Sequence, residues 1–332
     1  MTAPLTHWPS LHADHFKNLR VLVTGGAGFI GGHLVHALHD LGAKVTVIDD
    51  LVGTFGSWAN LDDLPAVVRV QASILDEQAI KQAMTGSTYV FHLAALGSVP
   101  GSVAEPRKYQ DVNVNGTFNI LEAARAAGVN RVMFAASSAA YGDSETLPKV
   151  EDMPVLPKSP YAANKVAGEA MMRAYADSLG VDTASLRYFN IFGPKQNANS
   201  AYAAVIAAFA KAILAGKPPV IFGDGEQSRD FTYVDNAVHA NLLAAASSKN
   251  IGGAVLNVAC AKRVNVNELA ALMLKELGRL DLKVEHRPER AGDVKHSLAD
   301  ISLTTKTIGY KPIVDFEPGL AATVAWYKTA AM

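Results

Sequence analysis

Tyr161 and Lys165 are the residues whose types and spacing point most directly to chemistry. On a helix, positions i and i+4 lie one turn apart on the same face, so the phenol and the ammonium would stand side by side. An ammonium about 4 Å away favours the phenolate by up to ~4 kcal/mol at an effective dielectric of roughly 20. That is about 3 pKa units, which would bring the tyrosine pKa from ~10 towards neutrality. The pair predicts a tyrosine that takes a proton from a sugar or alcohol hydroxyl and later returns it.

A glycine-rich run upstream gives this pair its context, because Tyr-x-x-x-Lys alone also occurs on ordinary helices. Gly25, Gly28 and Gly31 stand between a short β-branched run, 20–24, and a helical pattern that begins at Phe29. One glycine permits the tight turn, the next lets a pyrophosphate approach the backbone, and the third lets the helix pack on the strand. The pyrophosphate would lie at the helix N-terminus, where amide groups and the helix dipole favour an anion.

An acidic residue at the end of the next expected strand, Asp49, completes the nucleotide-binding motif. A carboxylate there accepts hydrogen bonds from the adenosine ribose hydroxyls and repels a 2′-phosphate. Asp50 adds a further negative charge. The two residues together predict NAD rather than NADP as the cofactor.

These groups need a scaffold that brings them to one edge of a sheet. As far as Asn190, short apolar runs alternate with helical patterns, which indicates βαβ units, a parallel sheet and right-handed crossovers. The expected strands are 20–24, 44–49, 67–72, 89–93, 131–136 and 182–187. The expected helices are 29–40, 76–84, 113–127 and 161–179.

The pattern changes beyond Asn190. We expect helices at 202–215, 235–246 and 267–276, and a strand at 254–259 that rejoins the sheet. The whole predicts an α/β protein with a Rossmann-type doubly wound parallel sheet and a smaller C-terminal substrate-binding lobe. The NAD-binding domain is expected at 19–190, rejoined by about 232–260, and the lobe at 191–231 and 261–332. An N-terminal arm, 1–18, is expected to lie on the body as a partly ordered polar extension.

Composition excludes several other classes of protein. The 332 residues are 49% hydrophobic and 18% charged, which suffices for a sizeable core. A formal net charge of -1 argues against a binder of nucleic acid or anionic membrane. Cys260 is the one cysteine, so the sequence predicts no disulfide framework, no metal site and a reducing, cytoplasmic setting. We find no signal peptide and no apolar stretch long enough to cross a membrane.

With these motifs in view, the chain resembles the extended short-chain dehydrogenase/reductase superfamily, and within it the nucleotide-sugar 4-epimerases. The motifs that match are 24–31, 92–95, Asn113, 137–142, 161–165, 187–194, 223–225 and 228–231. The resemblance runs from about residue 18 to about residue 320. The further runs 95–100, 201–206 and 296–301 make the chain most similar to bacterial UDP-N-acetylglucosamine 4-epimerases of surface-polysaccharide pathways.

The resemblance implies a reaction in which tightly held NAD oxidises C4 of the sugar to a ketone. The ketosugar then rotates about its diphosphate linkage, and the same hydride returns to the opposite face. Tyr161 would be the base and then the acid, while Ser137 would hydrogen-bond the C4 oxygen and relay the proton. Lys165 would lower the pKa of the tyrosine and bind the nicotinamide ribose.

The resemblance also implies which residues bind the cofactor and the substrate. The cofactor residues would be Gly25, Gly28, Phe29, Ile30, Gly31, Asp49, Asp50, Ser73, Ile74, Leu93, Ala94, Ala95, Asn113, Tyr161, Lys165 and Tyr188. The substrate residues would be Ser98, Ser137, Ser138, Tyr161, Asn190, Ala204, Val205, Phe222, Arg229, Arg290 and Ser297. Within this set, Arg229 and Arg290 match diphosphate-binding arginines, whose planar guanidinium suits phosphate oxygens. Phe222 would stack on uracil.

Several positions bear on the choice of reaction and sugar. Related 4,6-dehydratases and decarboxylases carry acids where this chain has Ser-Ala-Ala at 138–140, so epimerisation is favoured. Ser297 stands where the family limits the size of the sugar pocket by side-chain size, and a small residue leaves room for a 2-acetamido group.

Two positions depart from the family: Ser73 replaces an aspartate that contacts adenine, and Ala139 replaces a hydroxyl residue near the sugar. One hydrogen bond lost to an N-acetyl sugar is worth ~0.5–1.5 kcal/mol.

Two other interpretations stay open. A UDP-glucuronate 4-epimerase uses the same core but needs a polar or cationic pocket for the C6 carboxylate. A non-catalytic NAD-binding regulator would keep the fold without turnover, although Ser137, Tyr161 and Lys165 together argue against it. By resemblance, helices 113–127 and 161–179 would form the four-helix interface of a homodimer.

Overall fold

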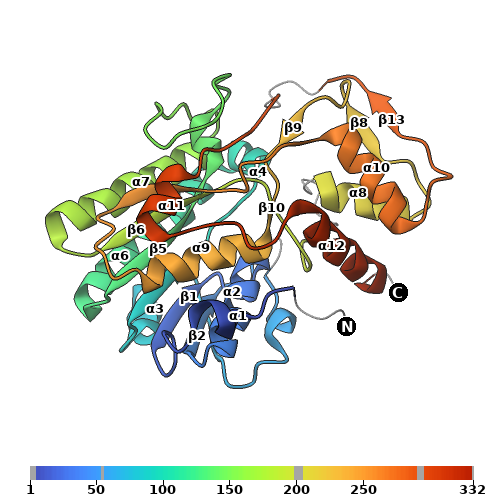
Figure 1. Ribbon diagram of the computed structural model, residues 1–332. Coiled ribbons are helices and arrows are strands. Elements are labelled where there is room, and N and C mark those ends of the chain that lie inside the picture. The colour runs from blue at the N-terminus through green and yellow to red at the C-terminus, as the bar shows by residue number, and fades with distance from the viewer. Residues whose placement is uncertain (1–4, 54–55, 198–204, 290–294, 331–332) are drawn as a thin grey trace.

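The computed structural model describes residues 5–53, 56–197, 205–289 and 295–330. Seven strands form its central sheet in the order β11-β6-β5-β4-β1-β2-β3, and every neighbouring pair is parallel (Figure 1). The strands are β1 (Arg20–Thr24), β2 (Lys44–Asp49), β3 (Val68–Gln71), β4 (Tyr89–His92), β5 (Arg131–Ser137), β6 (Thr183–Tyr188) and β11 (Ala254–Val258). The predicted doubly wound parallel sheet is thus confirmed.

Helices cover both faces of this sheet. On one face, α2 (Phe29–Asp40) packs against α9 (Val234–Ala246). On the other lie α3 (Glu77–Met84), α6 (Gly116–Ala127) and α7 (Pro160–Leu179). Because both faces are covered, a central strand such as β6 is buried along its whole length. The strand order reverses between β1 and β4, the place where open α/β sheets bind ligands beyond the carboxyl ends of their strands.

The expected helix 113–127 starts differently from the prediction. Residues Asp111–Asn115 form a π-helical turn, and α6 begins only at Gly116. Such turns are rare and occur frequently at functional sites. Two short helices precede it, α4 (Val99–Ala104) and α5 (Pro106–Gln110), each with a proline in its first turn. They escaped the sequence analysis because neither is long enough to show an apolar period.

The N-terminal segment is not the polar extension that its histidines suggest. Residues Trp8–His12 form helix α1, and Trp8 and Phe16 are buried in the main core beside α2. The Nε2 atom of His12 lies 3.0 Å from Nδ1 of His239 in α9. The expectation of a partly ordered polar arm is wrong for residues 5–18, because the burial of the two aromatic side chains anchors the segment to the body.

A second hydrophobic cluster lies beside the sheet domain. It gathers α8 (Val205–Leu214), α10 (Val266–Leu277) and α12 (Phe316–Ala330), which contact one another (Figure 1). Three two-stranded ladders flank it: β7 (Ile191–Phe192) with β10 (Thr232–Tyr233), β8 (Val220–Phe222) with β13 (Glu285–Arg287), and β9 (Ser228–Arg229) with β12 (Val264–Asn265). This is the region expected to form the substrate lobe, whose boundaries stay a prediction.

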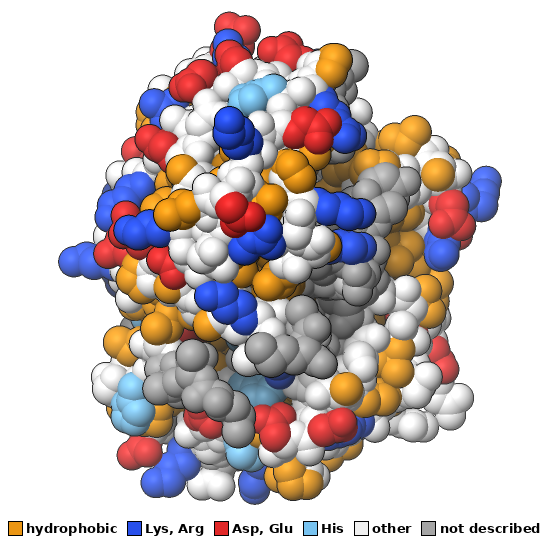
Figure 2. Space-filling model, turned by 90° about the vertical axis from the view of Figure 1, so that its right-hand side faces the viewer, with side chains coloured by type: hydrophobic (Ala, Val, Ile, Leu, Met, Phe, Trp, Pro, Cys, Tyr) orange, Lys and Arg blue, Asp and Glu red, His pale blue; other side chains and the backbone are white. Residues whose placement is uncertain are grey.

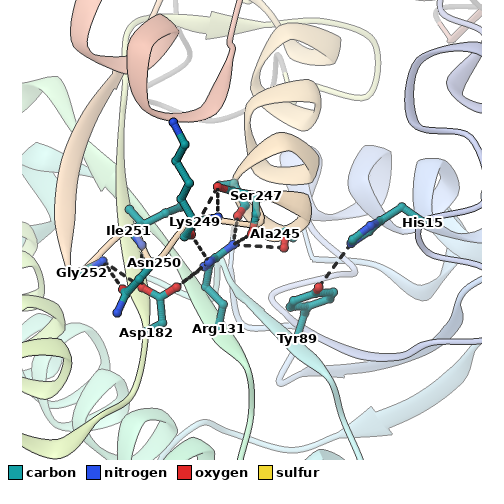
Figure 3. A network of polar contacts seen from close by, with 11 residues as sticks. His15, Tyr89, Arg131, Asp182, Ala245, Ser247, Lys249, Asn250, Ile251 and Gly252 are labelled. Atoms are coloured by element: carbon teal, nitrogen blue, oxygen red, sulfur yellow. Dashed lines mark hydrogen bonds and ion pairs between the residues drawn. The ribbon is translucent and has the colours of Figure 1, made fainter.

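Arg131 ties the sheet to the end of α9 at the amino edge of β5. Its Nε donates to Asp182 Oδ2 over 2.6 Å. Its Nη1 and Nη2 donate to the carbonyl oxygens of Ala245, Ser247 and Lys249 at the end of that helix (Figure 3). A cation at a helix C-terminus is favoured by the helix dipole, so this contact fixes α9 against the sheet.

The described surface is mixed in charge. On the face shown in Figure 2, acidic and basic side chains are interspersed, which accords with the formal net charge of -1. None of the helices in the described part of the chain combines the length and apolar character that crossing a membrane needs. Across the same residues, no group of three or more His, Cys, Asp or Glu side chains is placed to hold a metal ion.

Candidate active site

The glycine turn joins β1 to α2 and packs directly on the loop after β4. Gly25 has φ +72°, and a Cβ there would lie 2.7 Å from the Ala94 amide nitrogen. A Cβ on Gly31 would collide with the carbonyl oxygen of Gly25. Gly28 is the N-cap of α2, and no side chain caps that helix. The turn therefore offers the close backbone approach and the helix N-terminus that a pyrophosphate requires.

Asp49 lies beside this turn at the end of β2. Its carboxylate accepts from the Ala27 amide over 3.0 Å and from the Leu51 amide over 2.9 Å. Burial raises the pKa of Asp49, and the two amide bonds oppose that effect. Asp50 instead accepts from the amide of Val52 over 3.1 Å within its own loop. Asp49 is thus held against the glycine turn, where the sequence places the adenosine ribose.

Ser73 and Ile74 follow β3 on the same side of the site. The Ser73 hydroxyl accepts from the Leu75 amide over 3.2 Å, so it closes a local turn. Ile74 is buried, and its side chain fills the space in front of Gly116 at the start of α6. The expected adenine contact of these two residues stays a prediction.

The loop after β4 is clamped by Asn113 in the π-helical turn. The side-chain Oδ1 of Asn113 accepts from the Leu96 amide over 2.8 Å, and its Nδ2 donates to the Leu96 carbonyl over 3.0 Å. The Ala94 amide donates to the Thr24 hydroxyl over 3.1 Å. The expected cofactor residues Leu93, Ala94 and Ala95 thus lie between β1 and the π-helical turn, at the carboxyl edge of the sheet.

The three expected catalytic residues come from β5 and α7. Ser137 ends β5, while Tyr161 stands in the first turn of α7, which Ser159 caps by accepting from the Ala162 amide over 3.2 Å. The Ser137 side chain acts on Tyr161 by lowering the pKa of its phenol. The Nζ atom of Lys165 donates to the Ala135 carbonyl over 2.7 Å. The fold therefore brings the ends of these two elements together, as the spacing in the sequence suggests.

The pKa of Tyr161 corrects the opening prediction. The sequence predicts that Lys165 brings this pKa towards neutrality, but in the structure it lies above its usual value. Burial disfavours the phenolate, and the Ser137 side chain only partly offsets that effect. The ammonium of Lys165 lies instead against the Ala135 carbonyl and 4.8 Å from the centroid of the Phe134 ring. The prediction is wrong for the polypeptide alone.

Glu169 is a buried neighbour of this site that the sequence analysis missed. It stands one turn after Lys165 on the same face of α7, so continuing the i+4 spacing from Tyr161 would have found it. Its two oxygens accept from Nε and Nη2 of Arg187 over 2.8 and 2.7 Å. Burial lowers the pKa of Lys165 to about 8, and the Glu169 carboxylate opposes that shift.

The expected sugar residues Asn190 and Ser297 meet at the junction with the second cluster. Asn190 has φ +39°, and its Nδ2 donates to the Ser297 hydroxyl over 3.0 Å and to the Asp230 carbonyl over 3.0 Å. The Asp230 amide donates to the same hydroxyl over 3.3 Å. The structure therefore places these two residues in contact although they are 107 positions apart in the sequence.

The remaining expected substrate residues occupy several elements. Arg229 in β9 donates from Nη1 to the carbonyls of Ser228 and Lys295 over 3.0 and 3.1 Å. Ser98 caps α4 by accepting from the Gly101 amide over 3.0 Å. Ser138 opens a short 3-10 helix, Val205 begins α8 and Phe222 ends β8. Ala204 and Arg290 lie outside the described residues.

Tyr188, expected on the cofactor side, points its hydroxyl to α9. Asn241 Nδ2 donates to it over 2.6 Å, and burial raises its pKa. Its cofactor contact stays a prediction.

The site as a whole fits NAD. The turn has no room for a Cβ at Gly25 or Gly31 and leads into an uncapped helix N-terminus, which suits the pyrophosphate. The buried Asp49 suits the adenosine ribose. Lys165, Tyr161 and Ser137 lie at the ends of β5 and α7, where they could hold the nicotinamide side of the cofactor.

Comparisons with known proteins agree with this geometry. The family model described as "NAD dependent epimerase/dehydratase family" matches residues 21–259. A putative UDP-glucose 4-epimerase from Methanocaldococcus jannaschii is 36% identical over 310 residues, with 93% of this chain and 98% of that protein covered.

Two solved structures are similar over almost their whole length. UDP-N-acetylglucosamine 4-epimerase from Methanobrevibacter ruminantium, in complex with UDP-N-acetylmuramic acid, is 44% identical with a TM-score of 0.89, covering 95% of this chain and 99% of that one. UDP-glucose 4-epimerase from Thermus thermophilus, in complex with NAD, is 34% identical with a TM-score of 0.83, covering 94% and 100%. Its cofactor is NAD, and its enzyme class is that of the nucleotide-sugar 4-epimerases. The chain therefore belongs to the NAD dependent epimerase/dehydratase family, within the extended short-chain dehydrogenases/reductases.

Proposed function

We propose that this enzyme interconverts UDP-N-acetylglucosamine (UDP-GlcNAc) and UDP-N-acetylgalactosamine (UDP-GalNAc), and that it also accepts UDP-glucose and UDP-galactose. The observation that carries the N-acetylated pair is the small Ser297 side chain in contact with Asn190. Its hydroxyl accepts from Asn190 Nδ2 and from the Asp230 amide, so it is committed to the protein. The residue would therefore act by its size, leaving room for a 2-acetamido group.

In this proposal Tyr161 removes the proton from the C4 hydroxyl and later returns it. Ser137, whose side chain lowers the pKa of Tyr161, would hold the C4 oxygen and relay the proton. When bound, NAD supplies the acceptor for the C4 hydride and gives the hydride back. Because burial raises the Tyr161 pKa, the site needs positive charge to favour the phenolate. Lys165 would provide part of it and would bind the nicotinamide ribose.

The segment after Ser137 supports epimerisation over elimination or decarboxylation. The short helix Ser138–Tyr141 has the sequence SAAY and carries no carboxylic acid. Proton transfers beyond C4 need an acid or base at that place, so this site is suited to chemistry confined to C4.

We further assign the two expected parts of the chain to the two ligands. Residues 19–190 and about 232–260 would hold NAD, whereas 191–231 and 261–332 would hold the UDP-sugar. The backbone contacts of Arg229 with Ser228 and Lys295 orient its guanidinium, which would bind the diphosphate. Asn190 would contact the sugar, and Phe222 would stack on the uracil.

We also propose a homodimer in the cytoplasm, with α6 and α7 of each subunit forming a four-helix interface. Phe118 on α6 is 48% exposed, which suits such a contact. Sedimentation should give a dimer for the natural chain and a monomer for Phe118→Asp. A monomer in both cases would remove this part of the proposal.

The function is tested by anomer-resolved NMR of purified enzyme incubated separately with UDP-GlcNAc, UDP-glucose and UDP-glucuronate. We expect conversion of UDP-GlcNAc to UDP-GalNAc that is lost in Tyr161→Phe. Turnover of UDP-glucose alone would overturn the argument from Ser297 but not the mechanism. Turnover of UDP-glucuronate alone would make the enzyme a UDP-glucuronate 4-epimerase. No turnover with NAD supplied would favour a non-catalytic regulator.

A further inference from the structure

His92, the last residue of β4, is a buried histidine whose two ring nitrogens both have hydrogen-bond partners. It is 1% exposed. Nδ1 lies 2.7 Å from the hydroxyl of Thr24 at the end of β1, and Nε2 lies 3.0 Å from the hydroxyl of Thr117 in the first turn of α6. The ring therefore bridges the end of β1 and the first turn of α6.

Counting protons fixes the direction of the bond between His92 and Thr117. The Thr117 hydroxyl lies 2.7 Å from the carbonyl of Asn113, and a carbonyl only accepts, so Thr117 donates to it and must accept from His92 Nε2–H. Thr24 accepts from the Ala94 amide over 3.1 Å, and its own proton can go to Nδ1 of a neutral His92 ring. The contacts thus place a proton on Nε2, and in a neutral imidazole Nδ1 then accepts from Thr24.

A neutral ring also suits the surroundings of His92. Its centroid lies 5.6 Å from that of Phe134, and Lys165 Nζ lies 4.8 Å from the same Phe134 ring. Burial, with the Lys165 ammonium as a lesser cause, lowers the pKa of His92 to about 3. A charged imidazole here would repel the active-site lysine.

The segments that His92 joins are those expected to hold the cofactor. Thr24 directly precedes Gly25, whose α-carbon packs against Ala94. Asn113 clamps Leu96 in the loop after β4 through two bonds. One imidazole thus connects the glycine turn, this loop and the π-helical turn.

We propose that His92 is a positioning residue that, with Thr117, holds these three segments in the arrangement that binds NAD. The proposal rests on the proposed function only in that these segments bind the cofactor, whichever sugar is the substrate. His92 does not touch the reacting atoms in this account. It acts through Asn113 and Ala94.

A matched pair of variants tests the role without disturbing the shape of the core. Thr117→Val keeps the volume but removes the hydroxyl, whereas Thr117→Ser keeps the hydroxyl. NAD affinity of the cofactor-stripped full chain, measured by calorimetry without any sugar, should fall roughly tenfold in Thr117→Val and stay unchanged in Thr117→Ser. His92→Phe should weaken NAD binding at least as much, and combining it with Thr117→Val should add little further.

Two outcomes would overturn the proposal. One is a Thr117→Val protein with lowered stability but unchanged NAD affinity, because that would make the bond merely structural. The other is a nitrogen NMR spectrum of the ring showing His92 charged or protonated on Nδ1. Both readouts are independent of turnover, so a failure of the proposed sugar specificity would leave them unaffected.

Discussion

The Nζ atom of Lys165 donates a hydrogen bond over 2.7 Å to the carbonyl oxygen of Ala135, two residues before Ser137 on the same strand. The ammonium of α7 is thereby fixed to β5 at the point where the proposed proton relay begins. This hydrogen bond fixes the orientation of the Lys165 side chain. It keeps the positive charge buried near Ser137 rather than in solvent.

Lys165→Met is expected to lower kcat roughly a hundredfold or more, because in the proposed function this ammonium supplies part of the positive charge that the Tyr161 phenolate needs. Steady-state epimerisation measured with the NMR assay checks this. Lys158→Met is the matched control, since Lys158 pairs with Asp143 on the surface just before α7. Equal rates for the two variants would show that the ammonium has no part in the proton transfer.

Gly31 and Gly32 form a second matched pair, on neighbouring positions of α2. Gly31→Ala should abolish detectable NAD binding, because the new Cβ would collide with the Gly25 carbonyl. Gly32→Ala places its Cβ no closer than 3.8 Å to any neighbour, and alanine is favoured over glycine in a helix by roughly 0.5–1 kcal/mol. Calorimetric titration with NAD and urea unfolding of both variants measure the two effects. Retained NAD affinity in Gly31→Ala would contradict the assignment of the turn.

Ser297→Tyr should remove turnover of UDP-GlcNAc while keeping turnover of UDP-glucose, since a bulky side chain would fill the space for the acetamido group. Ser297→Ala is the control, because it keeps the size and loses only the bonds from Asn190 and Asp230. The ratio of kcat/KM for the two sugars is the measurement. An unchanged ratio in Ser297→Tyr would mean that the residue does not line the sugar pocket.

The sequence predicted well the features that depend on short-range spacing. The alternating apolar runs predicted the sheet, and local patterns predicted the glycine turn before α2 and the place of Asp49 at the end of β2. Contacts between distant segments were not predictable in this way. The bond from Asn190 to Ser297 joins positions 107 apart, and its geometry depends on how the second cluster packs.

The errors have physical causes of the same kind. The histidines of the segment around α1 indicated a polar surface extension, but Trp8 and Phe16 are buried in the core. The core site that they occupy exists only in the tertiary fold, so the local sequence does not reveal it. The pKa of Tyr161 was predicted from one neighbour, whereas burial by the whole site decides its direction. The spacing of residues along a helix predicts which side chains are neighbours. It does not predict how far burial removes them from water, which also shifts their pKa.

Buried histidines should make the protein less stable below neutral pH. Burial lowers the pKa of His12 to about 4, with the neighbouring His239 as the next cause, and burial lowers that of His239 to about 4. Between an unfolded-state pKa of 6.5 and about 4, the unfolded chain binds protons that the folded one does not. The free energy of unfolding should therefore fall as pH falls through this window, by roughly 1.4 kcal/mol per pH unit for each histidine.

Urea unfolding at several pH values measures that slope. His12→Gln should reduce it, because one depressed group is removed, and the exposed His7→Gln should leave it unchanged. The same slope in His12→Gln and the natural chain would contradict the assignment of the pH dependence to the contact between α1 and α9.

Arg131 should be among the most sensitive positions for stability, although it lies away from the site. Its side chain is 8% exposed and pairs with Asp182, and it also donates to carbonyls at the end of α9 (Figure 3). Arg131→Met would leave the half-buried Asp182 without its cation and the carbonyls without their donor. We expect a loss of ~3–5 kcal/mol in the free energy of unfolding. Arg131→Lys should recover part of this loss, since an ammonium keeps the charge but not the planar fork of the guanidinium.

Lys262→Met, which breaks the exposed pair with Asp315, is the control and should unfold at the same urea concentration as the natural chain. If Arg131→Met also unfolded there, the cation would not be what fixes α9 to the sheet.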